Sequence, residues 1–127
     1  MFTSITETVK TNIIRNFTSS EGCCRVVIGT IAFGMGLDSP NVRTVIHWGP
    51  STDIESYVQE SGRVGRDGLP ATAILYYTNT DFSGISGVSV DMKKYCKNAS
   101  SCRKESLFKY FDQINFISES LDICCDK

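Results

Sequence analysis

The sequence is poor in proline, with 3 residues, and has one histidine and one tryptophan among its 127 residues. Long apolar runs are also missing, since no stretch approaches the roughly 20 apolar residues that a membrane-spanning helix needs. The first residues, Met1 to Glu7, lack the basic start and apolar run of a secretory signal. With 41% apolar and 21% charged residues, the composition predicts an intracellular globular protein without a membrane partner.

A strong charge of one sign is missing too. The net charge is −1, whereas a strongly basic balance is typical of nucleic-acid-binding proteins. Basic side chains nevertheless gather between residues 93 and 109, against the single acid Glu105: Lys93, Lys94, Lys97, Arg103, Lys104 and Lys109. Two interpretations stay open. The segment is either a solvated helix face or a patch whose lysines, Lys93 and Lys94 first, contact DNA phosphates.

The six cysteines form an even number, which is compatible with a disulfide-stapled secreted domain. Their arrangement argues against it. Cys23 and Cys24 are neighbours, as are Cys124 and Cys125, and adjacent cysteines rarely bridge each other because the geometry is strained.

The first part of the chain predicts alternating helices and strands. Ser4 and Glu7 form a capping box, and apolar residues at helical spacing then predict a helix to residue 17. The β-branched run in residues 24–28 predicts a strand buried on both faces, with Cys23 and Cys24 packing at its start.

Two further strands are expected at residues 42–48 and 71–77. Between them, Thr52 and Glu55 form a second capping box, which predicts a helix that ends at Gly62. This order of elements predicts an α/β layer with a mainly parallel sheet.

The composition changes near residue 80. Residues 79–90 are polar and contain glycine, which predicts a linker with at most one helical turn. Helices are expected near residues 91–97 and 101–111, the latter with Leu107, Phe108 and Phe111 on one side. We therefore predict two domains, residues 1–80 and 81–127.

Two glycine-containing loops carry the candidate chemistry. Residues 30–38 follow a predicted strand; such a loop either lets backbone N–H groups approach an anion or is a tight connection. In residues 59–68, Arg63 and Arg66 lie among three glycines after a predicted helix. One arginine there suits the helix carbonyls, but two in a glycine frame suit phosphate oxygens across a cleft.

Together the two loops resemble motifs V and VI of the RecQ-family DNA helicases. Residues 42–50 and 53–60 match the family's intervening segment. The resemblance implies that residues 1–80 are part of a second RecA-like α/β domain, and that residues 81–127 begin a helical zinc-binding subdomain. It also implies an ATP-dependent 3′–5′ DNA helicase, located in the nucleus, with single-stranded DNA and duplex junctions as partners.

The resemblance also assigns roles to residues. Arg66 is implied to be the arginine finger on the γ-phosphate of ATP, with Arg63 as its companion. Gln59 is implied to couple ATP to motion, and Gly36 and Asp38 to lie near the nucleotide. Thr30 is implied to contact the DNA backbone, while Phe33 either stacks on a base or packs in the core.

The cysteines fit the implied zinc subdomain in part. The resemblance gives Cys102, Cys124 and Cys125 as three thiolate ligands, whereas structural zinc takes four. The family's last cysteine falls beyond residue 127, so we expect an incomplete site. Cys96 is either a substitute ligand or a buried thiol.

The 127 residues contain neither a Gly-x-x-x-x-Gly-Lys-Ser/Thr phosphate loop nor an Asp-Glu pair for Mg²⁺. ATP and Mg²⁺ would be held mainly by a first motor domain, so we expect no ATP hydrolysis by this chain alone. Two other classes of function stay open: a non-enzymatic module that binds DNA or partners, and a structural metal domain in residues 91–127.

Overall fold

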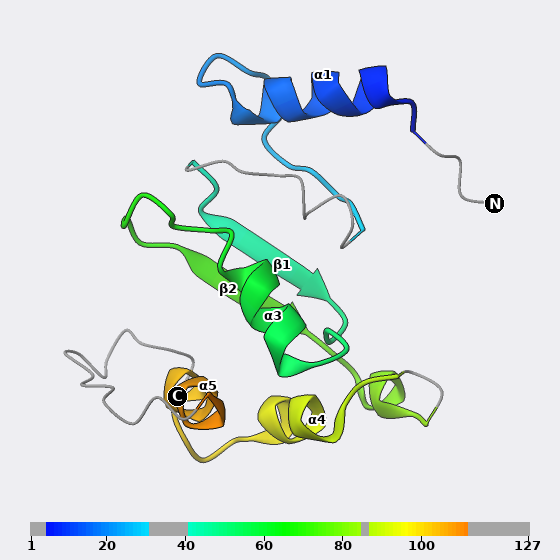
Figure 1. The fold of residues 1–127 in the computed structure, drawn as a ribbon, viewed down its shortest axis with the longest axis vertical. Coiled ribbons are helices and arrows are strands. Elements are labelled where there is room, and N and C mark those ends of the chain that lie inside the picture. The colour runs from blue at the N-terminus through cyan, green and yellow to red at the C-terminus, as the bar shows by residue number, and fades with distance from the viewer. Residues whose placement is uncertain (1–4, 31–40, 85–86, 112–127) are drawn as a thin grey trace. The chain divides into compact units, whose positions relative to one another are not determined.

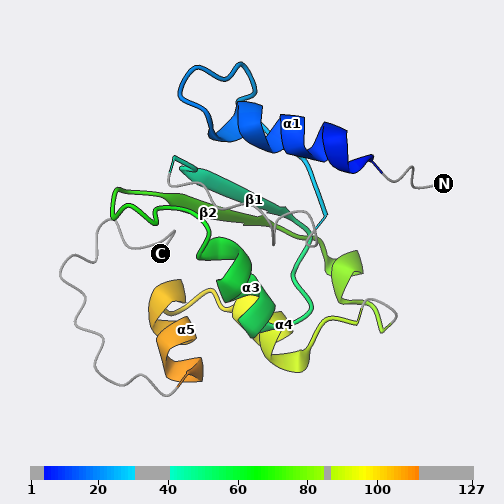
Figure 2. The same cartoon turned by 45° about the horizontal axis from the view of Figure 1, so that its top comes forward.

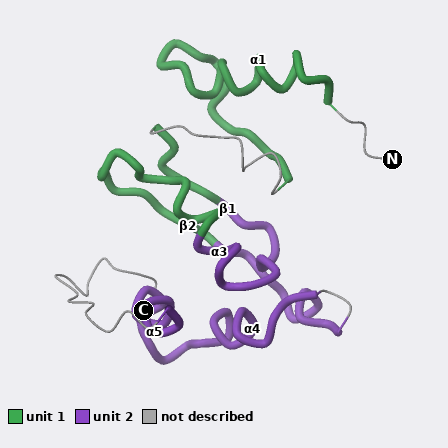
Figure 3. Tube along the Cα trace, in the orientation of Figure 1, with its two compact units in different colours: residues 1–45, 59–74 green, residues 46–58, 75–127 purple. Residues whose placement is uncertain are grey.

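The computed structural model describes residues 5–30, 41–84 and 87–111. The chain divides into two compact units (Figure 3), unit 1 with residues 1–45 and 59–74 and unit 2 with residues 46–58 and 75–127. The boundary near residue 80 stays a prediction. In chain order (Figure 1) the elements are α1 (Glu7–Thr18), β1 (Thr44–Trp48), α3 (Ile54–Ser61), β2 (Thr72–Tyr76), the 3-10 helix η1 (Asn79–Phe82), α4 (Val90–Lys97) and α5 (Arg103–Tyr110).

Strands β1 and β2 form a two-stranded parallel sheet. The Thr72 N–H donates to the Arg43 carbonyl at 2.8 Å, and the Gly49 N–H donates to the Tyr76 carbonyl at 2.9 Å. The partners advance in the same direction along both strands, which is the parallel pattern. The expected strands at 42–48 and 71–77 are therefore confirmed with slightly later starts, as is their parallel pairing.

Strand β1 is not buried on both faces. His47 is 8% exposed and its ring lies 5.0 Å from that of Tyr57 in α3, whereas Ile46 and Trp48 are 57% and 91% exposed. Trp48 packs along the sheet against Tyr76, with ring centroids 5.9 Å apart. Burial therefore alternates along β1, because α3 covers the face on which His47 lies.

The predicted strand at residues 24–28 is wrong. This segment has no regular secondary structure, and Val26 and Ile28 are 74% and 96% exposed. A β-branched run becomes a strand only when a neighbouring strand takes up its backbone hydrogen bonds. Within the described ranges β1 and β2 pair with each other. Cys23 is exposed and Cys24 half-buried, so their expected packing at a strand start is also wrong.

Helix α1 confirms the expected N-terminal helix but not its start. It begins at Glu7, and Thr6 at the capping position makes no side-chain hydrogen bond to the helix. The predicted capping residue, Ser4, lies outside the described residues. None of the residues of α1 is buried.

Helix α3 is capped one residue later than predicted. The Asp53 carboxylate, not the Thr52 hydroxyl, accepts the Ser56 backbone N–H, at 2.7 Å. The hydrogen bond lowers the pKa of Asp53. Aspartate suits this position because an anion there also meets the positive end of the helix dipole. The Thr52 hydroxyl instead donates to Asp53.

The apolar core lies in unit 2, where α3, α4 and α5 gather (Figure 2). Its fully buried side chains come from α3 and α4, and further apolar side chains pack around them: Ile54, Tyr57, Met92, Tyr95 and Cys96, surrounded by Val58, Leu75, Phe82, Val88 and Leu107. The helices expected near 91–97 and 101–111, and the single helical turn after residue 78, are thereby confirmed.

Polar contacts reinforce unit 2. The Tyr77 hydroxyl donates to the Cys96 carbonyl at 2.7 Å, and the Arg103 guanidinium donates to the Tyr95 carbonyl at 3.3 Å. The Tyr110 hydroxyl donates to Glu55 at 2.7 Å, which ties α5 to α3. Leu107 packs against the core as expected, but Phe111 is 40% exposed.

Candidate functional site in the arginine loop

The segment after α3 forms a closed turn with an arginine at its tip. We call residues 62–68 the arginine loop. The Gly68 N–H donates to the Gly65 carbonyl at 3.0 Å, so Arg66 and Asp67 occupy the two central positions of a β-turn. Gly65 and Gly68 have φ of +66° and +78°, in the left-handed region that favours glycine. The glycines therefore shape the turn that presents Arg66.

Gly65 also touches its surroundings closely. Its N–H donates to the Val42 carbonyl, just before β1, at 3.3 Å. A Cβ at position 65 would lie 2.9 Å from that of Ala71 and 3.0 Å from the Leu69 carbonyl oxygen. The loop backbone thus lies against neighbouring segments at Gly65 in a way that a side chain would prevent.

Asp67 forms a two-armed ion pair with Arg43, which lies next to Val42. Arg43 Nη1 donates to Asp67 Oδ1 at 2.8 Å, and Nη2 to Oδ2. The Leu69 N–H also donates to Oδ1, at 3.1 Å. The Arg43 hydrogen bonds and the Leu69 N–H lower the pKa of Asp67 to about 2, and the same pair raises the pKa of Arg43. Asp67 is therefore ionised at neutral pH.

Three predicted site residues lie at the end of α3 and in this loop. Gln59 is exposed in the last turn of α3 and Arg66 is exposed, with its Nε donating to the Gly62 carbonyl at 3.4 Å. Arg63 is half-buried; within residues 5–30, 41–84 and 87–111 its guanidinium makes no hydrogen bond or ion pair. A planar, permanently charged guanidinium in such a place offers paired donors to phosphate oxygens.

Other predicted nucleotide and DNA contacts are only partly described. Phe33, Gly36 and Asp38 lie outside the described residues, and Thr30 is exposed. Their roles stay predictions.

The predicted basic patch is engaged within the chain at several positions. Lys94 pairs with Asp91 at 3.1 Å and Lys109 with Glu105 at 2.7 Å, while Lys97 lies over the Phe82 ring. Exposed pairs of this kind are typical of a solvated helix face. Lys93 is half-buried, and DNA contact by Lys93 and Lys94 stays a prediction.

The zinc prediction concerns residues that are mostly undescribed. Cys124 and Cys125 lie outside the described residues, and Cys102 is half-buried just before α5. Cys96 is a core side chain, 1% exposed, and burial raises the pKa of its thiol; of the two alternatives for Cys96, the structure therefore shows the buried thiol. Among the described residues no three candidate ligands cluster.

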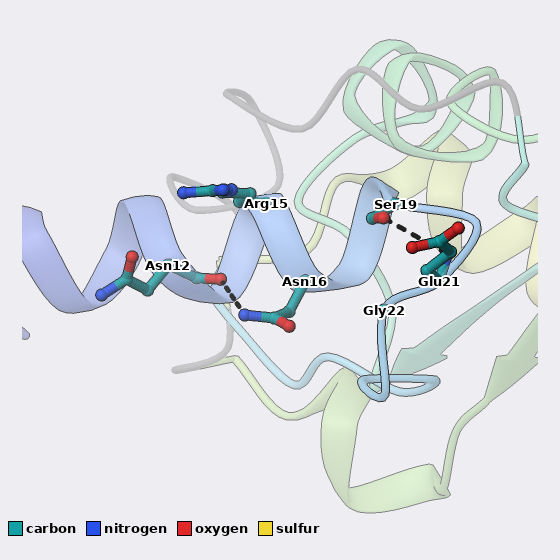
Figure 4. Close-up of a pocket in the computed structure, with 6 residues that line it drawn as sticks. All are labelled: Asn12, Arg15, Asn16, Ser19, Glu21 and Gly22. Carbon is teal, nitrogen blue, oxygen red and sulfur yellow. Dashed lines mark hydrogen bonds between the residues drawn. The ribbon is translucent and has the colours of Figure 1, made fainter.

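A polar depression of about 310 Å³ lies at the end of α1 (Figure 4), lined by Asn12, Arg15, Asn16, Ser19, Glu21 and Gly22. Several of its polar groups bond one another. Asn16 donates to the Asn12 carbonyl, and the Glu21 N–H donates to Ser19. None of the predicted site residues lines it.

Sequence reasoning missed Arg43 and Asp67 as residues that hold the arginine loop. They lie 24 residues apart. The signal that the sequence does offer is an acid directly after Arg66.

A family model, the helicase conserved C-terminal domain, matches residues 1–68. ATP-dependent DNA helicase Q1 of Pongo abelii is 41% identical over 127 residues, 92% of this chain and 19% of the relative. ATP-dependent DNA helicase Q-like 2 of Arabidopsis thaliana is 39% identical over 105 residues, which cover 74% of this chain and 15% of the relative. RecQ-like DNA helicase BLM of Xenopus laevis is 36% identical over 126 residues, which cover 81% of this chain and 9% of the relative.

The family model covers more than half of the chain, so the chain belongs to the helicase C-terminal domain family. With relatives among the Q1 and RecQ-like helicases, it is a RecQ-like member of that family. The chain spans between 9% and 19% of the lengths of the three relatives. No helix in the described ranges combines the length and apolar character needed to cross a bilayer.

Proposed function

We propose that this chain supplies the arginine-finger half of the ATP site in an ATP-dependent, 3′–5′ DNA helicase. Arg66 is the finger on the γ-phosphate, Arg63 its companion, and Gln59 the residue that couples nucleotide to motion. The observation that carries the proposal is the arginine loop, a glycine-shaped turn with Arg66 at its tip and Arg63 half-buried beside it.

The chemistry of phosphoryl transfer explains why such a loop is useful. Negative charge on the transferring phosphoryl group is stabilised by preorganised cations. The glycine turn sets the backbone on both sides of Arg66, so little reorganisation is needed when a triphosphate arrives. The 127 residues contain no Asp-Glu pair for Mg²⁺, and we propose that the ion is held mainly by another part of the motor.

DNA is the proposed second ligand, as a single strand and at duplex junctions, in the nucleus. Thr30, exposed after the irregular segment 24–28, supports a contact to the DNA strand, with Phe33, Gly36 and Asp38 following it in the sequence. Lys93 and Lys94 would add phosphate contacts from α4. Zinc on Cys102, Cys124 and Cys125 is proposed as a structural ion only.

A chimera tests the proposal. The corresponding segment of the Pongo abelii Q1 helicase is replaced by residues 1–127, and DNA-stimulated ATP hydrolysis is measured. Arg66→Ala is expected to lower the turnover number by roughly 10³-fold, since an arginine finger contributes that much or more. Arg15→Ala, which changes an exposed arginine of α1, is the matched control and leaves turnover unchanged.

The isolated chain is assayed in parallel and is expected not to hydrolyse ATP. A folded chimera that hydrolyses ATP equally well with Arg66→Ala contradicts the finger role. ATP turnover by the isolated chain that disappears with Arg66→Ala contradicts the assignment of the phosphate-binding half to another part of the motor.

A further inference from the structure

Both neighbours of Arg66 are tied to consecutive residues before β1. The Gly65 N–H donates to the Val42 carbonyl, and the Asp67 carboxylate binds the Arg43 guanidinium through both oxygens. The Arg43 carbonyl also accepts the Thr72 N–H at the start of β2. Residues 42 and 43 therefore anchor the loop on either side of Arg66 and the first residue of the strand that follows it, and all the residues in these contacts belong to unit 1.

The Asp67 side chain is an anion directly next to Arg66 in sequence. Its charged partner among the described residues is Arg43 and not Arg66. If Arg43 were neutral, the carboxylate would be an uncompensated anion directly next to Arg66 in the sequence, and a pair between the two would compete with any phosphate ligand. Arg43 has two effects: it fixes the loop, and it takes up the charge of Asp67.

We propose that Arg43 is a positioning residue for the arginine finger, which it serves by holding the Asp67 carboxylate away from Arg66. The inference rests on the proposed function of Arg66. It adds a residue 23 positions before Arg66 in the sequence that acts through Asp67 and does not itself touch the nucleotide.

This inference predicts an asymmetry between the two partners of the ion pair. Arg43→Gln leaves the carboxylate free to pair with Arg66. Asp67→Asn removes the competing charge and keeps an oxygen that can accept the Leu69 N–H. If the pair served only to hold the loop together, removing either partner would have the same effect.

The test measures binding of inorganic triphosphate to the full 127-residue chain by isothermal titration. Arg43→Gln is expected to weaken binding about tenfold, whereas Asp67→Asn binds at least as tightly as the unchanged chain. The double variant, Arg43→Gln with Asp67→Asn, recovers most of the lost affinity. Arg43→Lys keeps the charge, and its affinity for triphosphate is expected to lie between those of Arg43→Gln and the unchanged chain.

A second readout needs no ligand. Amide hydrogen exchange at Gly65 reports whether the loop is held at Val42, and it is expected to speed up with Arg43→Gln. Circular dichroism verifies that each variant is folded. If Arg43→Gln does not fold, the comparison of Arg43→Lys with Asp67→Asn replaces it, and weaker binding by Arg43→Lys alone still supports the inference.

The outcomes separate this inference from the proposed function. Triphosphate binding that is lost with Arg66→Ala but unaffected by Arg43→Gln overturns the role of Arg43 and leaves the finger intact. Equal losses with Arg43→Gln, Asp67→Asn and the double variant also overturn it. If Arg66→Ala changes neither triphosphate binding by the chain nor ATP turnover by the chimera, the finger role fails, and the exchange at Gly65 then decides whether Arg43 holds the loop.

Discussion

The contacts inside unit 1 differ in kind from the contacts inside unit 2. Every buried apolar side chain of the described residues lies in unit 2, on α3 and α4. Unit 1, which carries the arginine loop, has none among its described residues, and its loop is held by backbone hydrogen bonds and the Arg43–Asp67 pair. The difference shows that the site stands on polar, directional contacts while the apolar core lies elsewhere.

The core of unit 2 contains residues from inside and from outside the region that the family model matches. The helicase C-terminal model ends at residue 68, yet Met92, Tyr95 and Cys96 of α4 complete the core around Ile54 and Tyr57. Burial of apolar surface needs partners from both sides of the buried space. Residues after the matched region are therefore part of what stabilises α3, the helix from which the arginine loop emerges.

The largest expected effect breaks the core of unit 2. Met92 is 0% exposed, so Met92→Ala leaves a cavity and is expected to lower the free energy of unfolding by about 2–5 kcal/mol. Val90→Ala is the matched control on the same helix, where Val90 is 66% exposed. Urea unfolding followed by circular dichroism measures both. Similar small losses for the two variants would show that α4 does not complete the core.

A smaller effect is expected at the start of α3. Asp53→Ala removes the acceptor of the Ser56 N–H and is expected to reduce the free energy of unfolding by about 1 kcal/mol. Thr52→Ala is the matched control and should change it by less than about 0.5 kcal/mol, since Thr52 is exposed. Thermal unfolding of both variants checks this. If Thr52→Ala is less stable than Asp53→Ala, then Thr52 caps the helix, as the sequence pattern predicts.

The smallest effect is a local response of unit 1 to acid. The folded-state pKa of Asp67 is about 2, below the ordinary value of 3.8. The contribution of the Arg43–Asp67 pair is therefore complete above pH 3.8 and is lost as the pH falls through about 2. Amide exchange at Gly65 should lose protection in this window before exchange at Gly49, whose N–H bonds Tyr76 in unit 2.

Asp67→Asn is the control for the acid response, since its loop has no carboxylate to titrate. Simultaneous loss of protection at Gly65 and Gly49 would mean that acid unfolds the whole chain and that Asp67 has no local role.

Much of the fold could be predicted because the relevant signals are local. The apolar positions Ile54 and Tyr57 predict the buried face of α3, and the β-branched run in residues 42–48 predicts β1. The same reasoning failed at Val26 and Ile28, where an equally β-branched run is exposed and unpaired with either described strand. Periodicity reports what a segment can form, whereas pairing depends on which strand lies beside it.

The candidate site divides in the same way. Arg63 and Arg66 could be found from sequence because their glycine frame is continuous. Arg43 could not, because its partner is 24 residues away and no local pattern links an arginine before one strand to an acid before the next. Even between neighbouring residues, the sequence pattern did not identify which one caps α3. Asp53 is the cap in place of Thr52, because several oxygens near a helix start are suitable acceptors.

By itself the sequence determined most of the helices and strands, the strand wrongly expected at residues 24–28 excepted, the two arginines in their glycine frame and the resemblance to RecQ-type helicases, because these depend on neighbouring residues. Only the tertiary structure decided that Met92, Tyr95 and Cys96 close the core, that one face of β1 is open, and that Arg43 holds the loop of Arg66 through Asp67. Those outcomes depend on contacts between residues far apart in the chain, which form when side chains exclude water together or pair their charges in space.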